Sequence, residues 1–308
     1  MATKLASPAI PEIVPEKQRL GLLRSFWLRF ASNRLAVMSI VGLIILISIA
    51  VFGPGLYPQD ANKLDYAAIN ALPNPAHWFG TDNLGRDTLA RLMLGLRVSL
   101  IVAAYVEALN ILLGVSLGLL AGYFGGILDV LVTRLADMLF AFPGLLLAIL
   151  VAAAFGAPVT ERFGGVGRLL LVAGSLSLVS WPLMARFIRS QTLVLREQDY
   201  VTAARSLGAS NFHIISRHIL PNVIGLIIVS STLDVAGVVV NESVLSLLGL
   251  GIQPPDPSIG KMITDAIPFL ENNPFQVFLP SLVLILIVQG VSFFGDGLRD
   301  AFDPQTLP

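Results

Sequence analysis

The sequence predicts an all-α polytopic membrane protein with six transmembrane helices. The first observation is composition: 55% of the 308 residues are hydrophobic and only 13% are charged, whereas a soluble domain carries about 25% charged residues. The second is a series of six apolar runs, each near or above the roughly 20 residues that a helix needs to cross the hydrocarbon core. Because the runs are continuous rather than alternating, they favour helices over the strands of a barrel.

The six predicted spans follow one another with more polar segments between them. The first ends in FGPGLYP without a small-residue cleavage site and is too long for the apolar core of a signal peptide, so we expect a retained span. The fifth is interrupted by three polar side chains, Asp234, Asn241 and Glu242. The spans are Leu35–Gly53, Val98–Ala121, Leu135–Phe155, Val166–Met184, Val223–Leu250 and Val277–Phe294.

The distribution of Lys and Arg predicts the orientation. With the N-terminus in the cytoplasm, 13 of the 20 basic residues fall in cytoplasmic segments, so both termini are expected there. The bias is weakened by Lys63, Arg86, Arg91 and Arg97 in an outer segment. The chain then divides into a cytoplasmic segment 1–34, a first span 35–53, an extracytoplasmic segment 54–97, a domain of five spans 98–296 with a cytoplasmic loop 191–221, and a cytoplasmic tail 297–308.

The cytoplasmic loop contains the polar stretch YVTAARSLGASNFHIISRHILPN, residues 200–222. YVTAARSL predicts a short helix that Gly208 ends, because glycine takes the left-handed conformation past a helix end at no steric cost. Ser210 or Asn211 is expected to cap a second helix, NFHIISRHIL, and Pro221 marks the start of the fifth span. The sequence therefore predicts a helix–turn–helix on the cytoplasmic face.

Two interpretations of this helix–turn–helix are open from the residues alone. One is an interfacial amphipathic helix on anionic lipid. The other is a docking element for the groove of a partner protein. Such an element would offer close approach at Ala203 and Ala204, apolar anchors at Phe212, Ile214 and Ile215, and charge at Arg205 and Arg217.

The pattern AA-x3-G-x10-ILPN, from Ala203 and Ala204 through Gly208 to Asn222, resembles the EAA loop of ABC-importer permeases. The leading Glu of that loop is Thr202 here. Other segments are similar to permeases of the dipeptide/oligopeptide/nickel group, and the resemblance covers roughly residues 20–305. They are FGTDNLGRDTLARLMLGLRVSL (Phe79–Leu100), LSLLGLGIQPPDPSIGKM (Leu245–Met262), GDGLRDAFDP (Gly295–Pro304), and FWLRFASNRLAVMSIVGLIIL, which resembles the extra first span of the C-type member of the permease pair.

The resemblance implies the type I ABC-importer permease fold, located in a prokaryotic cell (inner) membrane. A second homologous permease would complete the translocation path, two ATP-binding subunits would use ATP and Mg on the cytoplasmic face, and an extracytoplasmic substrate-binding protein would deliver the substrate. That substrate would be a di- or oligopeptide, with nickel, glutathione or an oligosaccharide as alternatives. The loop would couple the permease to the ATPase through Tyr200, Ala203, Ala204, Arg205, Gly208, Ala209, Phe212 and Pro221.

Small residues and charges inside the spans carry further predictions. Gly114, Gly118 and Gly122 repeat at every fourth position of the second span, and this spacing predicts close helix–helix packing. Glu107 in the second span and Asp137 at the start of the third are expected to serve in packing or as polar anchors near helix ends.

Three polar residues of the fifth span are candidates for the translocation path or its gate. Asp234, Asn241 and Glu242 are costly in lipid, so we expect them to face the bundle interior or a water-filled cavity. The resemblance implies a structural or gating role for Glu242, because it matches a carboxylate common in the family. Asp234 is the more individual residue, and a place lining the path competes with that of a buried or interface-paired carboxylate.

Several classes of function lack support in the sequence. The chain has no cysteine, no G-x4-G-K-[ST] phosphate-binding loop and no HExxH motif, so no enzyme activity, cofactor or metal of its own is predicted. Zero net charge gives no indication of a nucleic-acid partner. A stand-alone channel or secondary transporter is the main alternative, but it predicts inverted repeats that the two halves do not show. An integral membrane enzyme would need a convergent catalytic set.

Overall fold

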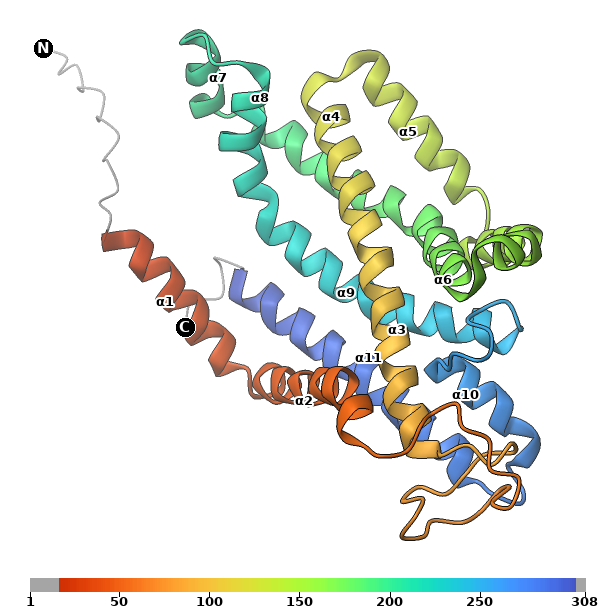
Figure 1. The fold of residues 1–308 in the computed structure, drawn as a ribbon. Coiled ribbons are helices and arrows are strands. Elements are labelled where there is room, and N and C mark those ends of the chain that lie inside the picture. The colour runs from red at the N-terminus through yellow and green to blue at the C-terminus, as the bar shows by residue number, and fades with distance from the viewer. Residues whose placement is uncertain (1–16, 303–308) are drawn as a thin grey trace, which may run out of the picture.

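The computed structural model describes residues 17–302, which form helices joined by loops (Figure 1). Within these residues the only β-type pairing is an isolated bridge between Thr81 and Asp87, so the predicted all-α class is confirmed. The ends of the predicted cytoplasmic segments, residues 1–16 and 303–308, lie outside the described residues. The helices are α1 (Lys17–Ser32), α2 (Arg34–Leu56), α3 (Thr88–Asn110), α4 (Ser116–Phe124), α5 (Gly126–Phe140), α6 (Gly144–Leu195), α7 (Asp199–Ser206), α8 (Asn211–Ile214), α9 (Leu220–Leu247), α10 (Ile259–Ala266) and α11 (Phe275–Phe302).

Five helical stretches of the described chain are long and apolar enough to cross a membrane: Arg34–Leu56, Thr88–Phe124, Gly144–Leu195, Asn211–Leu247 and Phe275–Phe302. Two of them include a π-helical turn, Ile111–Val115 between α3 and α4 and Ile215–Ile219 between α8 and α9.

The longest of these stretches, α6, is bent back on itself. Gly164 has non-helical dihedral angles of φ 61° and ψ −150°, a conformation that residues with a Cβ rarely adopt. The two arms run antiparallel, because Gly144 lies against Val179 and Gly156 lies against Arg168. Helix α6 therefore provides both the third and the fourth predicted spans.

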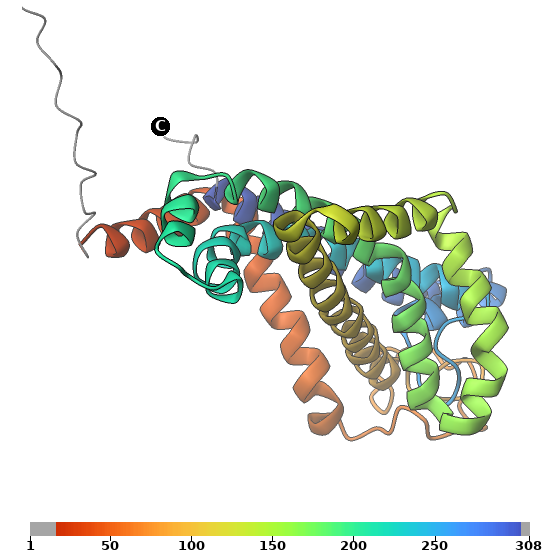
Figure 2. The ribbon, with the colours of Figure 1, turned by 90° about the horizontal axis from the view of Figure 1, so that it is seen from above.

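The bounds predicted for the third span, Leu135–Phe155, are wrong. The helix breaks at residues 141–143, where Pro143 precedes the first residue of α6. The preceding helix, α5, lies across one end of the bundle (Figure 2). Hydropathy merged the two because α5 has an apolar face of its own. The second span also starts earlier than Val98, because Asp87 caps α3 by accepting a hydrogen bond from the Ala90 N–H.

The connections sort onto two opposite edges of the bundle. Figure 2 shows α1, α5 and α7 along one edge, and the turn between the arms of α6 and the connection 57–87 along the other. The end of α11 joins the first edge, since Phe302 packs against Gly225 near the start of α9. The α7–α8 loop, the first helix and the end of the last helix thus share one edge of the bundle.

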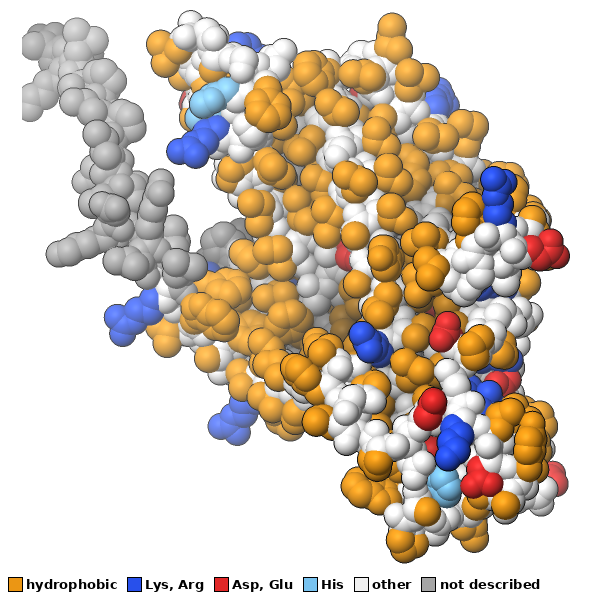
Figure 3. Space-filling model, in the orientation of Figure 1, with side chains coloured by type: hydrophobic (Ala, Val, Ile, Leu, Met, Phe, Trp, Pro, Cys, Tyr) orange, Lys and Arg blue, Asp and Glu red, His pale blue; other side chains and the backbone are white. Residues whose placement is uncertain are grey.

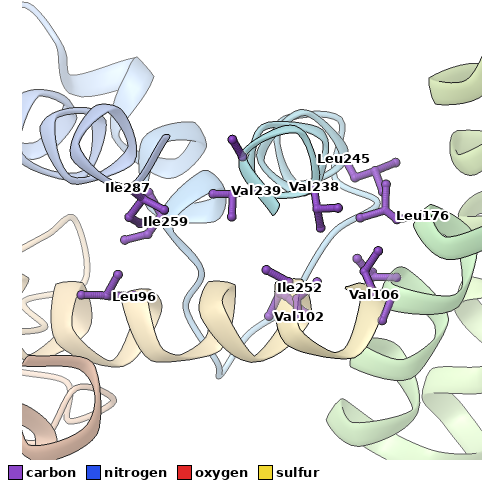
Figure 4. Packing of buried hydrophobic residues seen from close by; sticks show 14 of the residues in the cluster. Leu96, Val102, Val106, Leu176, Val238, Val239, Leu245, Ile252, Ile259 and Ile287 are labelled. Carbon is purple, nitrogen blue, oxygen red and sulfur yellow. The ribbon is translucent and has the colours of Figure 1, made fainter. Parts of the chain in front are cut away.

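A continuous apolar core ties the spans together. Figure 4 shows side chains of α3, α6, α9, α10 and α11 meeting at its centre, with Val102, Val106 and Leu245 fully buried. Hydrophobic side chains also cover the visible flank of the molecule (Figure 3). Apolar residues on the inside and the outside of a helical bundle are what a lipid environment requires.

Candidate functional site

The α7–α8 loop has the predicted helix–turn–helix form. Gly208 follows the end of α7 with φ 84°, and its N–H donates to the Arg205 carbonyl over 3.0 Å. The next N–H, of Ala209, donates to the Ala204 carbonyl over 3.1 Å, which completes the helix end. Of the two predicted caps the structure uses Ser210, whose hydroxyl accepts from the His213 N–H at 3.3 Å.

The loop is fixed to the bundle by contacts behind its tip. The Tyr123 hydroxyl at the end of α4 donates to the Asn211 amide oxygen over 2.9 Å. Arg196, just after α6, donates to the Gly122 carbonyl over 2.8 Å. Ile214 was predicted to be an exposed anchor, and this is wrong: it is fully buried beside Val201 in a cluster that α4, α6 and α9 complete. The loop is therefore a fixed projection of the bundle.

Two large apolar side chains lie at the tip of this projection. Leu207 is 88% exposed and Phe212 is 81% exposed, although they flank a turn of polar and small residues. An apolar pair held out on a rigid support is typical of a surface that docks in a groove. Phe212 was among the predicted coupling residues and Leu207 was not. Of the remaining predicted residues, Tyr200, Ala203, Arg205, Gly208 and Pro221 are exposed, and Ala204 and Ala209 are half-buried against the cluster below.

The glycine series of the second span packs against the second arm of α6 within the same chain. A Cβ on Gly118 would lie 2.7 Å from the Ala185 carbonyl oxygen, and one on Gly122 would lie 2.8 Å from the Arg189 carbonyl oxygen. Gly114 meets Met184 in the same way. These approaches place α4 directly beside the helix that leads into the α7–α8 loop.

The three polar residues of the fifth span do not form one site. Glu242 is 1% exposed and accepts hydrogen bonds from Ser246 at 2.8 Å and Ser99 at 3.3 Å. The Ser99 hydroxyl in turn accepts from the Ile259 N–H, so Glu242 ties α3, α9 and α10 together. Asn241 is exposed on α9. Successive residues of a helix point about 100° apart, so Glu242 and Asn241 lie on different faces of α9.

Asp234 belongs to a polar cluster that the sequence did not predict. The Asn110 amide donates to Asp234 over 2.7 Å and to Glu107 over 3.4 Å. Its carbonyl oxygen accepts from Ser177 and Ser180 of α6, both at 3.0 Å. The position near a helix end that was expected for Glu107 is wrong, because α3 and α4 continue as one helical stretch of 37 residues. The sequence held two signals of this cluster. Glu107 and Asn110 are three positions apart, as are Ser177 and Ser180, and this spacing places each pair on one face of a helix.

The connection 57–87 at the opposite end is a folded cap and not a loose loop. Asp82 pairs with Arg86 at 2.7 Å and with Arg91 at 3.4 Å, and Gln276 of α11 donates to the Thr81 carbonyl over 2.8 Å. The Tyr57 hydroxyl donates to Asp87 over 3.2 Å. Burial, together with the negative charge of Asp87, raises the pKa of Tyr57.

Comparison with known proteins agrees with this architecture. Residues 114–307 match the family described as "Binding-protein-dependent transport system inner membrane component", and residues 21–73 match the "N-terminal TM domain of oligopeptide transport permease C". The chain is 39% identical over 283 residues to the glutathione transport system permease protein GsiD of Pectobacterium atrosepticum, covering 92% of this chain and 91% of the relative. It is 38% identical over 298 residues to GsiD of Escherichia coli, covering 96% and 95%.

A solved structure shows the same fold. The inward-facing MetNI methionine ABC transporter contains a chain that aligns with a TM-score of 0.54 at 18% identity, over 69% of this chain and 97% of that one. Fold and sequence together define a polytopic permease subunit of the type I arrangement. The chain belongs to the binding-protein-dependent transport system inner membrane components, as a permease subunit of an ABC importer of the peptide/nickel group.

Proposed function

We propose that the α7–α8 loop is the element through which ATP, used by separate ATP-binding subunits, drives this permease. The observation that carries the proposal is the exposed pair Leu207 and Phe212 on a loop whose base is bonded to α4 and α6. Such a pair suits the groove of an ATP-binding subunit, and the rigid base would transmit movement of that subunit to the spans. ATP and Mg would be bound by those subunits and not by this chain.

The remaining assembly follows the family. A second homologous permease would complete the path, and a substrate-binding protein would dock on the folded cap around the connection 57–87. Both termini and the α7–α8 loop would be cytoplasmic, because the basic residues concentrate in the segments on that side. The chain would divide into a cytoplasmic segment, a first span, an extracytoplasmic segment, a domain of five spans and a cytoplasmic tail, with the helix bounds that the structure gives. No nucleic acid takes part.

The proposed substrate is peptide-like. The support is the similarity to permeases named for oligopeptide and glutathione transport. Glutathione and short peptides are therefore the first ligands to test, ahead of nickel and oligosaccharides.

Affinity purification of the chain in mild detergent, with ATPase activity measured on the same sample, tests the coupling proposal. We expect a second permease and ATP-binding subunits to copurify, and Leu207→Asp and Phe212→Asp to lose the ATP-binding subunits. Leu72→Asp is the matched control, because Leu72 is 66% exposed on the opposite side of the bundle. Recovery of the chain alone, or equal recovery of ATP-binding subunits with all three variants, would contradict the proposal and favour a stand-alone channel or carrier.

The same preparation tests the substrate. The copurified or genetically adjacent binding protein is titrated with glutathione, dialanine and Ni²⁺ by calorimetry. Binding of either peptide supports a peptide-like substrate, whereas binding of Ni²⁺ alone would overturn it.

A further inference from the structure

Two carboxyl groups face each other among the spans without a cation between them. Glu107 of α3 is 7% exposed, and it interacts directly with Asp234 of α9. Among the described residues no Lys, Arg or His forms an ion pair with either one. Two carboxylates this close repel each other when both are ionised. The repulsion is relieved when the two groups share a proton or when a positively charged group binds between them, so the pair can accept a cationic partner from outside the chain.

Unused hydrogen-bond acceptors are directed into the same place. Glu107 Oε1 and Ser231 Oγ are both buried, and neither has a hydrogen-bond partner of ordinary geometry, although the Ser231 hydroxyl is close enough to interact with Glu107. Ser231 lies beside Glu107, one turn of α9 before Asp234. A buried polar atom without a partner is costly, so a site of this kind is completed by a ligand or by water. Glu107, Ser231 and Asp234 together offer three acceptors, which matches the three N–H donors of a primary ammonium group.

The cluster is accessible from a hollow between α6 and α9. This hollow has a volume of about 260 Å³ and is bordered by Asp234 together with Ser180 and Ser230 and four apolar side chains. A carboxylate at such an opening is not compatible with a lipid-facing surface, so this side of the chain faces water or another protein. The mixture of one acid, two hydroxyls and apolar walls suits the end of a small organic amine.

A metal ion fits less well. The described residues contain no group of three or more His, Cys, Asp or Glu side chains that could hold one. The two carboxylates of the cluster are accompanied by an amide and hydroxyls, and the Asn110 side chain directs its NH₂ group, not its oxygen, at both acids.

We propose that Asp234 and Glu107 bind the free amino group of the transported substrate within the membrane. Asn110 is a positioning residue, because it bonds both acids and is itself held by Ser177 and Ser180. The inference rests on the proposed peptide-like substrate, and it adds that the permease itself, and not only the binding protein, recognises the positive end of that substrate.

Thermal unfolding of the detergent-purified complex tests the site directly. The probe is glycinamide hydrochloride, which carries a primary ammonium group and no carboxylate. N-acetylglycinamide is the uncharged counterpart, and NaCl at the same ionic strength controls for salt. We expect the unfolding midpoint to rise with the logarithm of the glycinamide concentration and not with either control, because a ligand that binds only the folded state stabilises it.

Variants locate the binding. Asp234→Asn and Glu107→Gln preserve side-chain size and are each expected to abolish the glycinamide shift, so either suffices if the other fails to assemble. Asp137→Asn, an exposed carboxylate outside the cluster, should keep the full shift. No shift in the wild type, an equal shift with NaCl, or a shift that survives both cluster variants would overturn the proposal. Copurification and ATPase activity of the same sample report separately on the proposed importer function.

Discussion

Replacement of Gly208 by valine isolates the contribution of one backbone conformation to coupling. Gly208 has φ 84°, and no atom lies within 4 Å of the position that a Cβ would occupy. The added Cβ therefore meets no other segment of the chain, and the expected cost is that of holding a β-branched residue in the left-handed region. That cost is about 1–2 kcal/mol, which corresponds to an approximately 5- to 30-fold fall in the equilibrium constant that favours the native turn.

Gly208 is exposed at the tip of the loop, outside the buried cluster at its base, so this strain is expected to change the tip and leave the spans assembled. Transport by Gly208→Val should fall, by at most about 5- to 30-fold, at unchanged membrane abundance if docking requires the native turn. Gly208→Asn is the control, because asparagine occupies the left-handed region more readily. Substrate uptake and substrate-stimulated ATPase activity are measured in reconstituted vesicles. Wild-type uptake by the valine variant would refute the reasoning, and so would an asparagine variant as defective as valine.

Three further substitutions test other contacts. Gly118→Val should lower accumulation of the folded chain, because its Cβ would collide with a backbone carbonyl of α6 and overpacking costs about 1–3 kcal/mol; unchanged membrane abundance would contradict this. Asp129→Asn should lower the unfolding midpoint, because it weakens the pairing with Arg189, which is worth up to about 1 kcal/mol. The decrease should be larger than that caused by Asp137→Asn, because the Asp137–Arg186 pair is half exposed. The hydrogen bond from Arg189 lowers the pKa of Asp129 in the folded state. The stabilisation is therefore complete above the ordinary aspartate pKa of about 3.9 and is lost as pH falls below that value. The difference in unfolding midpoint between Asp129→Asn and the wild type should then vanish in acid. Glu242→Ala should destabilise the chain more than Glu242→Gln, because alanine removes the acceptor of the buried Ser99 and Ser246 hydroxyls at a cost of about 1–3 kcal/mol. Equal unfolding midpoints for the two variants would argue against a structural role of Glu242.

Local chemistry made part of the loop predictable. Gly208 and Ser210 act through their own backbone and side chain within three residues, so the end of α7 and the cap of α8 follow from sequence alone. The burial of Ile214 does not, because the surfaces that cover it belong to α4, α6 and α9. Side-chain type indicated an apolar anchor, and tertiary packing determined which way it points.

The spans show the same division. Hydropathy found the membrane-crossing segments, yet it could not separate α5 from the first arm of α6, because both are apolar and the break at 141–143 is short. The cluster around Asn110 was beyond reach for a different reason. Asn110 and Asp234 are 124 positions apart. Their contact depends on the rotation of α3 and α9 about their own axes, which a nearly uniform apolar surface does not determine.

One helix connects the proposed coupling loop to two intramembrane acids, Asp234 and Glu242. Asn211–Leu247 runs as a single stretch of 37 residues, so at 1.5 Å per residue Asp234 lies about 35 Å along it from the loop. Glu242, bonded to α3 and to a serine one turn further on, fixes the far part of the helix in a fully buried environment. Asp234 is held by the Asn110 amide, faces Glu107 and lies beside an open hollow. A tilt imposed at the loop is therefore expected to pivot near Glu242 and to act on the Asp234–Asn110 contact, which links ATP use at one end to release of a bound amino group in the middle.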